Sequence, residues 1–177
     1  MYIARSVRET NFFYFKLNYL VILYAHSLPM TSVSYPYEKA ESWRYIFVSV
    51  GKRKIEKVVD FVAIEGNMVN LGFGDLLPDG SIDDKANSNN GDIIKVLATI
   101  IDILKDFTME YPFVQIVFRG STPERTKLYA RILQTYYPTF VREFEIAAFL
   151  LVDGRVKVLP YNPKAQQNYL AFLIKRI

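Results

Sequence analysis

Residues 114–129 read VQIVFRGSTPERTKLY, and this stretch decides how the rest of the chain is arranged. Its first part, residues 114–118, is almost wholly apolar, as in a strand that is buried on both faces of a sheet. Ser121 or Thr122 then provides a helix cap, and Pro123 suits the first turn of a helix. We therefore predict a central strand, a tight turn and a helix.

The segments on either side of this unit predict the remaining elements. Upstream, three segments rich in β-branched and aromatic residues indicate an antiparallel meander of strands. Between them and Pro112, apolar residues recur with the period of a helix, which predicts an amphipathic helix. Downstream, Asp153-Gly154 between two apolar runs is a strong hairpin signal. The predicted elements are strands at 44–50, 55–64 and 68–73, a helix at 93–110, a strand at 114–118, a helix at 122–136, and strands at 144–152, 155–159 and 169–175.

This order predicts an α+β domain with one mixed sheet and two helices. Three antiparallel strands followed by helix, strand and helix is also the order of the ribonuclease H-like fold, and a plain α+β sandwich is the alternative. Fold analogy of this kind carries no function by itself.

Residues 30–177 form this single domain, and residues 1–29 precede it as an extension. Residues 12–24 are an apolar run, but Lys16 and Asn18 interrupt it, and it is too short to span a bilayer comfortably. Three interpretations stay open. The extension is sequence upstream of a true start at Met30, or an amphipathic helix docked on the domain or on a membrane, or a secretory signal.

Composition excludes several kinds of chemistry. The chain has no cysteine, which excludes disulfides, zinc thiolate sites and cysteine nucleophiles and makes a reducing cytoplasm the simplest location. Its only histidine, His26, lies in the extension, so imidazole catalysis is not expected in the domain. Residues 1–29 carry +2 of the formal net charge of +4, and the +2 that remains for the domain is not typical of a dedicated nucleic-acid binder. Whether the domain is an enzyme stays open.

The first candidate site is the acidic loop, residues 76–92, together with Asp75 before it. This is the longest segment without periodicity, and such loops are often functional. Asp75, Asp84 and Asp92 could converge on Mg²⁺ or Mn²⁺, because these ions prefer oxygen ligands. Alternatively, the Asn and Asp residues make turns and favour the start of the next helix. The candidate ligand residues are Asp75, Asp83, Asp84, Ser88, Asn89, Asn90 and Asp92.

The second candidate site is the turn and helix start after the central strand. Gly120 allows a close approach of the backbone. Hydroxyl groups, helix amides and the guanidinium of Arg125 could there hold a phosphate or carboxylate. The alternative is ordinary helix capping, with a salt bridge from Arg125 to the acidic loop. The candidate residues are Gly120, Ser121, Thr122, Arg125 and Tyr129.

Several polar runs recur in one order in a known family. They include residues 45–49, 70–75, 82–84, 88–92 and 95–99, and Gly120-Ser121-Thr122 followed by Arg125 and Tyr129. Through them the chain resembles an uncharacterised bacterial family, domain of unknown function 6934, over about residues 35–177. The family begins near the Tyr-Pro-Tyr segment, which favours Met30 as the start. Because it has no established activity, the resemblance implies membership without a mechanism.

The leading hypothesis is a cytoplasmic binding or regulatory module, with an anionic or polar ligand held between the acidic loop and the helix start at 120–122. One alternative is a metal-dependent nuclease or phosphotransfer enzyme that uses Asp75, Asp84 and Asp92. Another is a protein–protein interaction module, in which two copies could join through an exposed sheet edge or through the aromatic face. We expect no cofactor for the binding module, Mg²⁺ or Mn²⁺ for the enzyme, and no membrane span.

Overall fold

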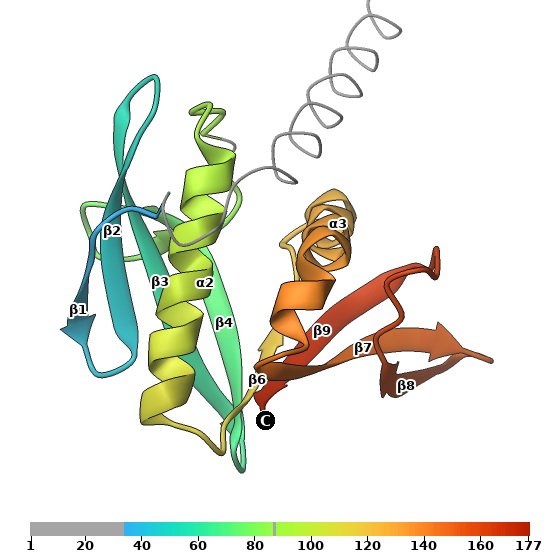
Figure 1. Ribbon diagram of the computed structural model, residues 1–177. Coiled ribbons are helices and arrows are strands. Elements are labelled where there is room, and N and C mark those ends of the chain that lie inside the picture. The colour runs from blue at the N-terminus through green and yellow to red at the C-terminus, as the bar shows by residue number, and fades with distance from the viewer. Residues whose placement is uncertain (1–33, 87) are drawn as a thin grey trace, which may run out of the picture.

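The computed structural model describes residues 34–86 and 88–177, which form one mixed sheet of nine strands and two helices (Figure 1). The predictions for residues 1–29 lie outside the described residues. The elements are β1 (Tyr37–Glu41), β2 (Arg44–Val50), β3 (Lys54–Glu65), β4 (Met68–Leu76), β5 (Ile82–Asp83), α2 (Ile93–Glu110), β6 (Gln115–Phe118), α3 (Pro123–Phe140), β7 (Phe144–Val152), β8 (Arg155–Pro160) and β9 (Tyr169–Arg176).

The sheet joins an antiparallel meander to a second group of strands. Its order is β1-β2-β3-β4-β6-β9-β7-β8, and β5 pairs with β4. β6 runs parallel to β4, whereas β9 lies between β6 and β7 and is antiparallel to both. The predicted α+β class and meander are confirmed. The prediction omitted β1, which is mostly charged, and β5, which consists of two residues inside the acidic loop.

Both helices pack on the same face of the sheet. Val69, Ile116, Ile174 and Ile146 lie opposite one another on successive strands, and all are buried in the core cluster beneath the helices. On α2 the Phe107 ring stacks on a sheet phenylalanine at 3.6 Å between ring centroids. Aromatic packing of this kind stabilises the contact beyond its area. The domain therefore has two layers, and most of the second sheet face carries no helix.

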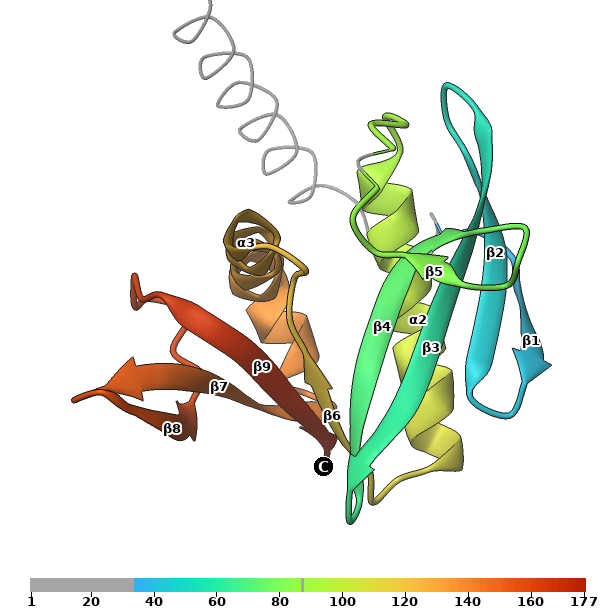
Figure 2. The ribbon, with the colours of Figure 1, turned by 180° about the vertical axis from the view of Figure 1, so that it is seen from behind.

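The two halves of the sheet separate at β4, because one edge of this strand pairs with two different strands. Residues 68–70 of β4 pair with β6, and Asp75 and Leu76 pair with β5. Beyond the first pairing, β6 and β4 diverge, so that the two halves of the sheet spread apart in both views (Figures 1 and 2). The acidic loop lies on one side of this divergence, and the start of α3 lies on the other.

Candidate functional site

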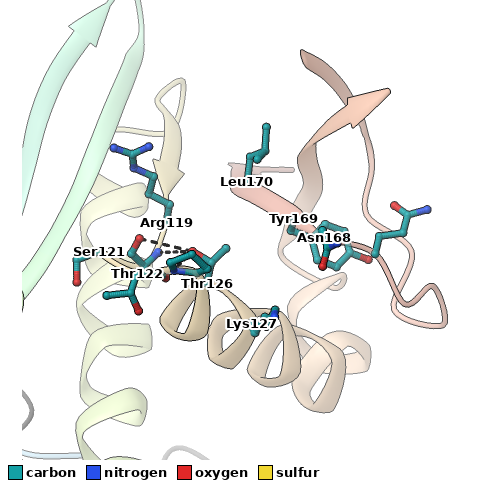
Figure 3. A pocket seen from close by; sticks show the side chains of 11 residues that line it. Arg119, Ser121, Thr122, Thr126, Lys127, Asn168, Tyr169 and Leu170 are labelled. Atoms are coloured by element: carbon teal, nitrogen blue, oxygen red, sulfur yellow. Dashed lines mark hydrogen bonds between the residues drawn. The ribbon is translucent and has the colours of Figure 1, made fainter. Parts of the chain in front are cut away.

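A cavity of about 510 Å³ opens where the start of α3 faces the start of β9 (Figure 3). One wall consists of residues 119–123 with Thr126 and Lys127, and the other consists of residues 167–170. This space is termed the α3–β9 cavity. Its volume lies in the range typical of small-molecule sites, a few hundred cubic ångströms and upward.

The first wall is held by hydrogen bonds within the turn. A Cβ on Gly120 would lie 2.4 Å from the Cβ of Arg125 and from the backbone nitrogen of Thr126, so the chain passes here only without a side chain. The buried hydroxyl of Thr126 accepts a hydrogen bond from the Gly120 amide at 3.1 Å and donates to the Thr122 carbonyl at 3.2 Å. Thr122 caps α3 by accepting from the Arg125 amide, as the sequence predicted.

The second wall is anchored by aromatic packing. The ring of Tyr169 lies 5.2 Å from the ring of Phe172 and 5.5 Å from that of Tyr161, between centroids. Its hydroxyl lies within donating distance of the Ala165 carbonyl, at 3.2 Å, and burial raises the pKa of this phenol. The exposed residues 167–168 lie directly before Tyr169, so the packed tyrosine ring positions the backbone next to them.

The charged side chains at the cavity are both basic. Arg119 and Lys127 are exposed, and within residues 34–86 and 88–177 neither side chain makes an ion pair or a hydrogen bond. Figure 3 shows Lys127 on α3, whereas Arg119 extends away from α3 at the other end of the wall. No carboxylate lines the cavity. The lining therefore carries net positive charge, with the Glu124 carboxylate outside it near Lys127.

Arg125 faces the acidic loop instead of the cavity. Its guanidinium donates to the backbone carbonyl of Asp84, to that of Lys85 at 3.1 Å and to that of Ala86 at 2.6 Å. Ser121 donates to the same Asp84 carbonyl at 2.7 Å. The two predicted constellations are therefore in contact, but through backbone carbonyls, and the predicted salt bridge is absent from the described ion pairs. We term this contact the Arg125 clamp.

Most of the candidate residues in the acidic loop bind other parts of the domain. The Asp83 carboxylate accepts from the amides of residues 85 and 86 and thus makes a turn. Buried Asn90 donates to the Ser49 hydroxyl at 2.8 Å and to the Arg53 carbonyl at 3.0 Å, which ties the loop to the β2–β3 hairpin. Asp92 is the first residue before α2, but its carboxylate accepts from Tyr35 at 2.7 Å and from Ser49 at 2.6 Å.

A buried ion pair lies at the base of the loop. Lys57 is 4% exposed, and its ammonium contacts the Asp75 carboxylate across the β3–β4 pair and donates to the Ser88 hydroxyl at 2.7 Å. A buried charge needs such partners because leaving water is costly. Sequence analysis did not select Lys57, since only the strand register places it opposite Asp75.

The carboxylates of the metal hypothesis are not brought together. Among the described residues, no three carboxylate or imidazole groups lie close enough to hold one ion. Asp75 pairs with Lys57, and Asp92 accepts from Tyr35 and Ser49. Asp84 is exposed and joins the clamp through its carbonyl.

The structure places the remaining candidates on both sides of the turn. Gly120, Ser121 and Thr122 line the α3–β9 cavity. Tyr129 lies outside the cavity lining and packs against Phe118, and burial raises the pKa of its hydroxyl. Asn89 is exposed in the acidic loop, with a left-handed backbone at φ 39°.

The far wall at residues 167–170 and the side chains of Arg119 and Lys127 were not among the site residues predicted from the sequence. The polar residues 166–168 before the last strand were the available signal for that wall. Their partner across the cavity depends on the pairing of β9 with β6, which a single sequence does not reveal.

The fold and the cavity together define a two-layer α+β domain with a polar, basic cavity at one end of its second helix. None of the described helices is long and apolar enough to cross a membrane. The chain belongs to the family of unknown function DUF6934, whose model matches residues 31–177. No curated protein and no solved structure matches it, so the ribonuclease H-like alternative rests on element order alone.

Proposed function

We propose that this domain is a binding module that holds a small anionic ligand in the α3–β9 cavity. The observation that carries the proposal is the charge of the cavity lining, which includes Arg119 and Lys127 and no carboxylate. The sequence hypothesis put the ligand between the acidic loop and the helix start. We move it to the opposite side of the turn, because the Arg125 clamp occupies the original position.

The walls also suggest what else the ligand carries. Tyr169 and Leu170 offer apolar surface beside the exposed amides of Gln167 and Asn168. Small-molecule sites commonly combine apolar walls with a few polar groups that fix orientation. We infer a ligand that joins a phosphate or carboxylate to a flat or apolar part. A cytoplasmic location is part of the proposal, since a chain without cysteine suits a reducing compartment.

Isothermal titration calorimetry with three probes tests the proposal. We expect phenyl phosphate to bind more tightly than inorganic phosphate, because only the former reaches the apolar wall, and phenol to bind more weakly than both. Lys127→Gln should weaken phenyl phosphate binding about tenfold, equivalent to about 1.4 kcal/mol. Lys164→Gln is the matched control, since Lys164 is exposed before β9 but does not line the cavity.

The proposal fails if none of the probes binds at millimolar concentration. It also fails if Lys127→Gln and Lys164→Gln have equal effects, because the attraction would then be nonspecific.

A further inference from the structure

The strand β8 is an open edge of the sheet. It pairs only with β7, and no described element lies beyond it in either view (Figures 1 and 2). All six of its residues are exposed, including Val156 at 59% and Val158 at 50%. Next to them on the sheet face without helices is Leu151, at 62%. Exposed apolar side chains on an open edge favour pairing with another strand, whereas Arg155, Lys157 and Pro160 limit the registers in which this edge can pair.

The register shows which backbone groups this edge offers. The amide of Tyr161 donates to the carbonyl of Ile146 on β7 at 2.9 Å. Because backbone groups alternate in direction along an antiparallel strand, Val156, Val158 and Pro160 point theirs away from β7. Pro160 therefore removes no hydrogen bond from the β7 ladder. Two amides and three carbonyls are directed outward.

The opposite edge of the sheet is built differently. β1 has five residues, among them Glu38, Lys39 and Glu41. Its side chains also bind α2, through Tyr37 to Asp106 at 2.5 Å and Lys39 to Glu110 at 2.5 Å. A short, charged edge of this kind resists strand addition. β8 is the edge with an apolar surface to offer.

We propose that β8 pairs antiparallel with β8 of a second copy of this chain, about a two-fold axis at Val158. An axis at Val156 would place Arg155 opposite Lys157, and an axis at Lys157 would place two lysines opposite each other. Like charges directly opposite on paired strands are destabilising. An axis at Leu159 would leave Val158 with Pro160 as the only kind of hydrogen-bonded pair within β8. Because proline has no amide hydrogen, each such pair would form one hydrogen bond instead of two.

The axis at Val158 places no like charges directly opposite each other and keeps Pro160 out of the central pair. Val158 exchanges both backbone hydrogen bonds with Val158 of the second copy. Each Val156 amide donates to a Pro160 carbonyl, whereas the Val156 carbonyl receives no hydrogen bond in return because proline has no amide hydrogen. Lys157 then lies opposite Leu159. The basic residues and the proline of β8 thus disfavour the other registers and permit this one. A self-complementary contact of this kind is what a two-fold dimer requires.

Light scattering on the full chain tests whether the dimer exists. We expect a mass twice the 20.6 kDa of one chain at micromolar concentration. Val158→Lys should raise the dissociation constant at least about tenfold, because it places two lysines at the axis. Val62→Lys is the matched control: Val62 is 56% exposed on β3, on the same helix-free face but in the other half of the sheet. It should leave the dimer intact.

Cross-linking tests the register, and the chain contains no cysteine to give a background. Directly opposite Cβ atoms lie about 4.5–5.5 Å apart, so a short bis-maleimide should join Val158→Cys subunits efficiently. Val62→Cys subunits should stay unlinked. A monomeric chain at about 100 μM, well above micromolar affinity, would overturn the proposal. So would a dimer that links through position 62 and not through position 158, because that result indicates face-to-face packing.

Discussion

Removing the Arg125 clamp should destabilise the domain without abolishing ligand binding. In Arg125→Ala the carbonyls of residues 84–86 lose a charged donor, and such hydrogen bonds contribute about 1.5–3 kcal/mol each when buried. Arg125 is only partly buried, and water can replace it at the freed carbonyls. We therefore expect the free energy of unfolding to fall by about 2 kcal/mol in total, which corresponds to a Tm lower by about 4–8 °C for a domain of this size.

Urea denaturation followed by circular dichroism measures this change. Arg131→Ala is the matched control, since Arg131 is exposed on α3 and makes no hydrogen bond or ion pair with the described residues. Arg125→Lys should recover less than half of the loss, because one ammonium cannot reach three carbonyls. Phenyl phosphate affinity should change by less than about threefold. If Arg125→Ala unfolds like the control but no longer binds the probe, Arg125 is a ligand residue and the clamp reasoning is wrong.

Three further predictions concern the fold. Lys57→Met should lower the free energy of unfolding by about 3 kcal/mol because it leaves the Asp75 carboxylate, whose side chain is 19% exposed, without its ion-pair partner, and the double variant with Asp75→Leu should recover stability in the same denaturation assay. Gly74→Ala should cost about 1–3 kcal/mol, since its Cβ would lie 2.5 Å from the Asp83 carbonyl oxygen; unchanged stability would contradict this close approach. Burial raises the pKa of Tyr161 to about 12. Because the folded-state pKa exceeds the unfolded value near 10, the contribution of Tyr161 to the free energy of unfolding is complete below pH 10 and is lost as the pH rises towards 12. Tyr161→Phe should therefore flatten the decline in stability over that interval.

Local patterns predicted the elements well where the signal lies within one segment. The period of apolar residues predicted α2 at its observed bounds, Ile93–Glu110. The hairpin signal at Asp153-Gly154 is matched by positive φ angles of 53° and 72° at these residues. α3 extends beyond its predicted end to Phe140, with Pro138 inside it, because packing against the sheet outweighs the helix-breaking preference of proline.

The candidate site was only half predictable. The turn at 119–122 carries its own signal, because glycine, hydroxyl residues and proline at a helix start have local causes. The wall at 167–170 meets it only through the pairing of β6 with β9. In the same way, the sequence marked Arg125 as a charge near an acidic loop, but not that it binds carbonyl groups instead of carboxylates. Contacts that depend on long-range register are not contained in local patterns.

The position of β9 also affects how the domain is made. Of the nine strands it is the last to be synthesised, yet it joins β6 to β7 in the middle of the sheet. The β1–β4 meander and α2 precede it and can pack on each other while translation continues. The β7–β8 hairpin has no neighbouring strand until β9 emerges from the ribosome, so the free edge of β7 is exposed in the nascent chain. At about 5–20 residues per second this interval lasts on the order of a second. During it the exposed strand edge is accessible to a chaperone.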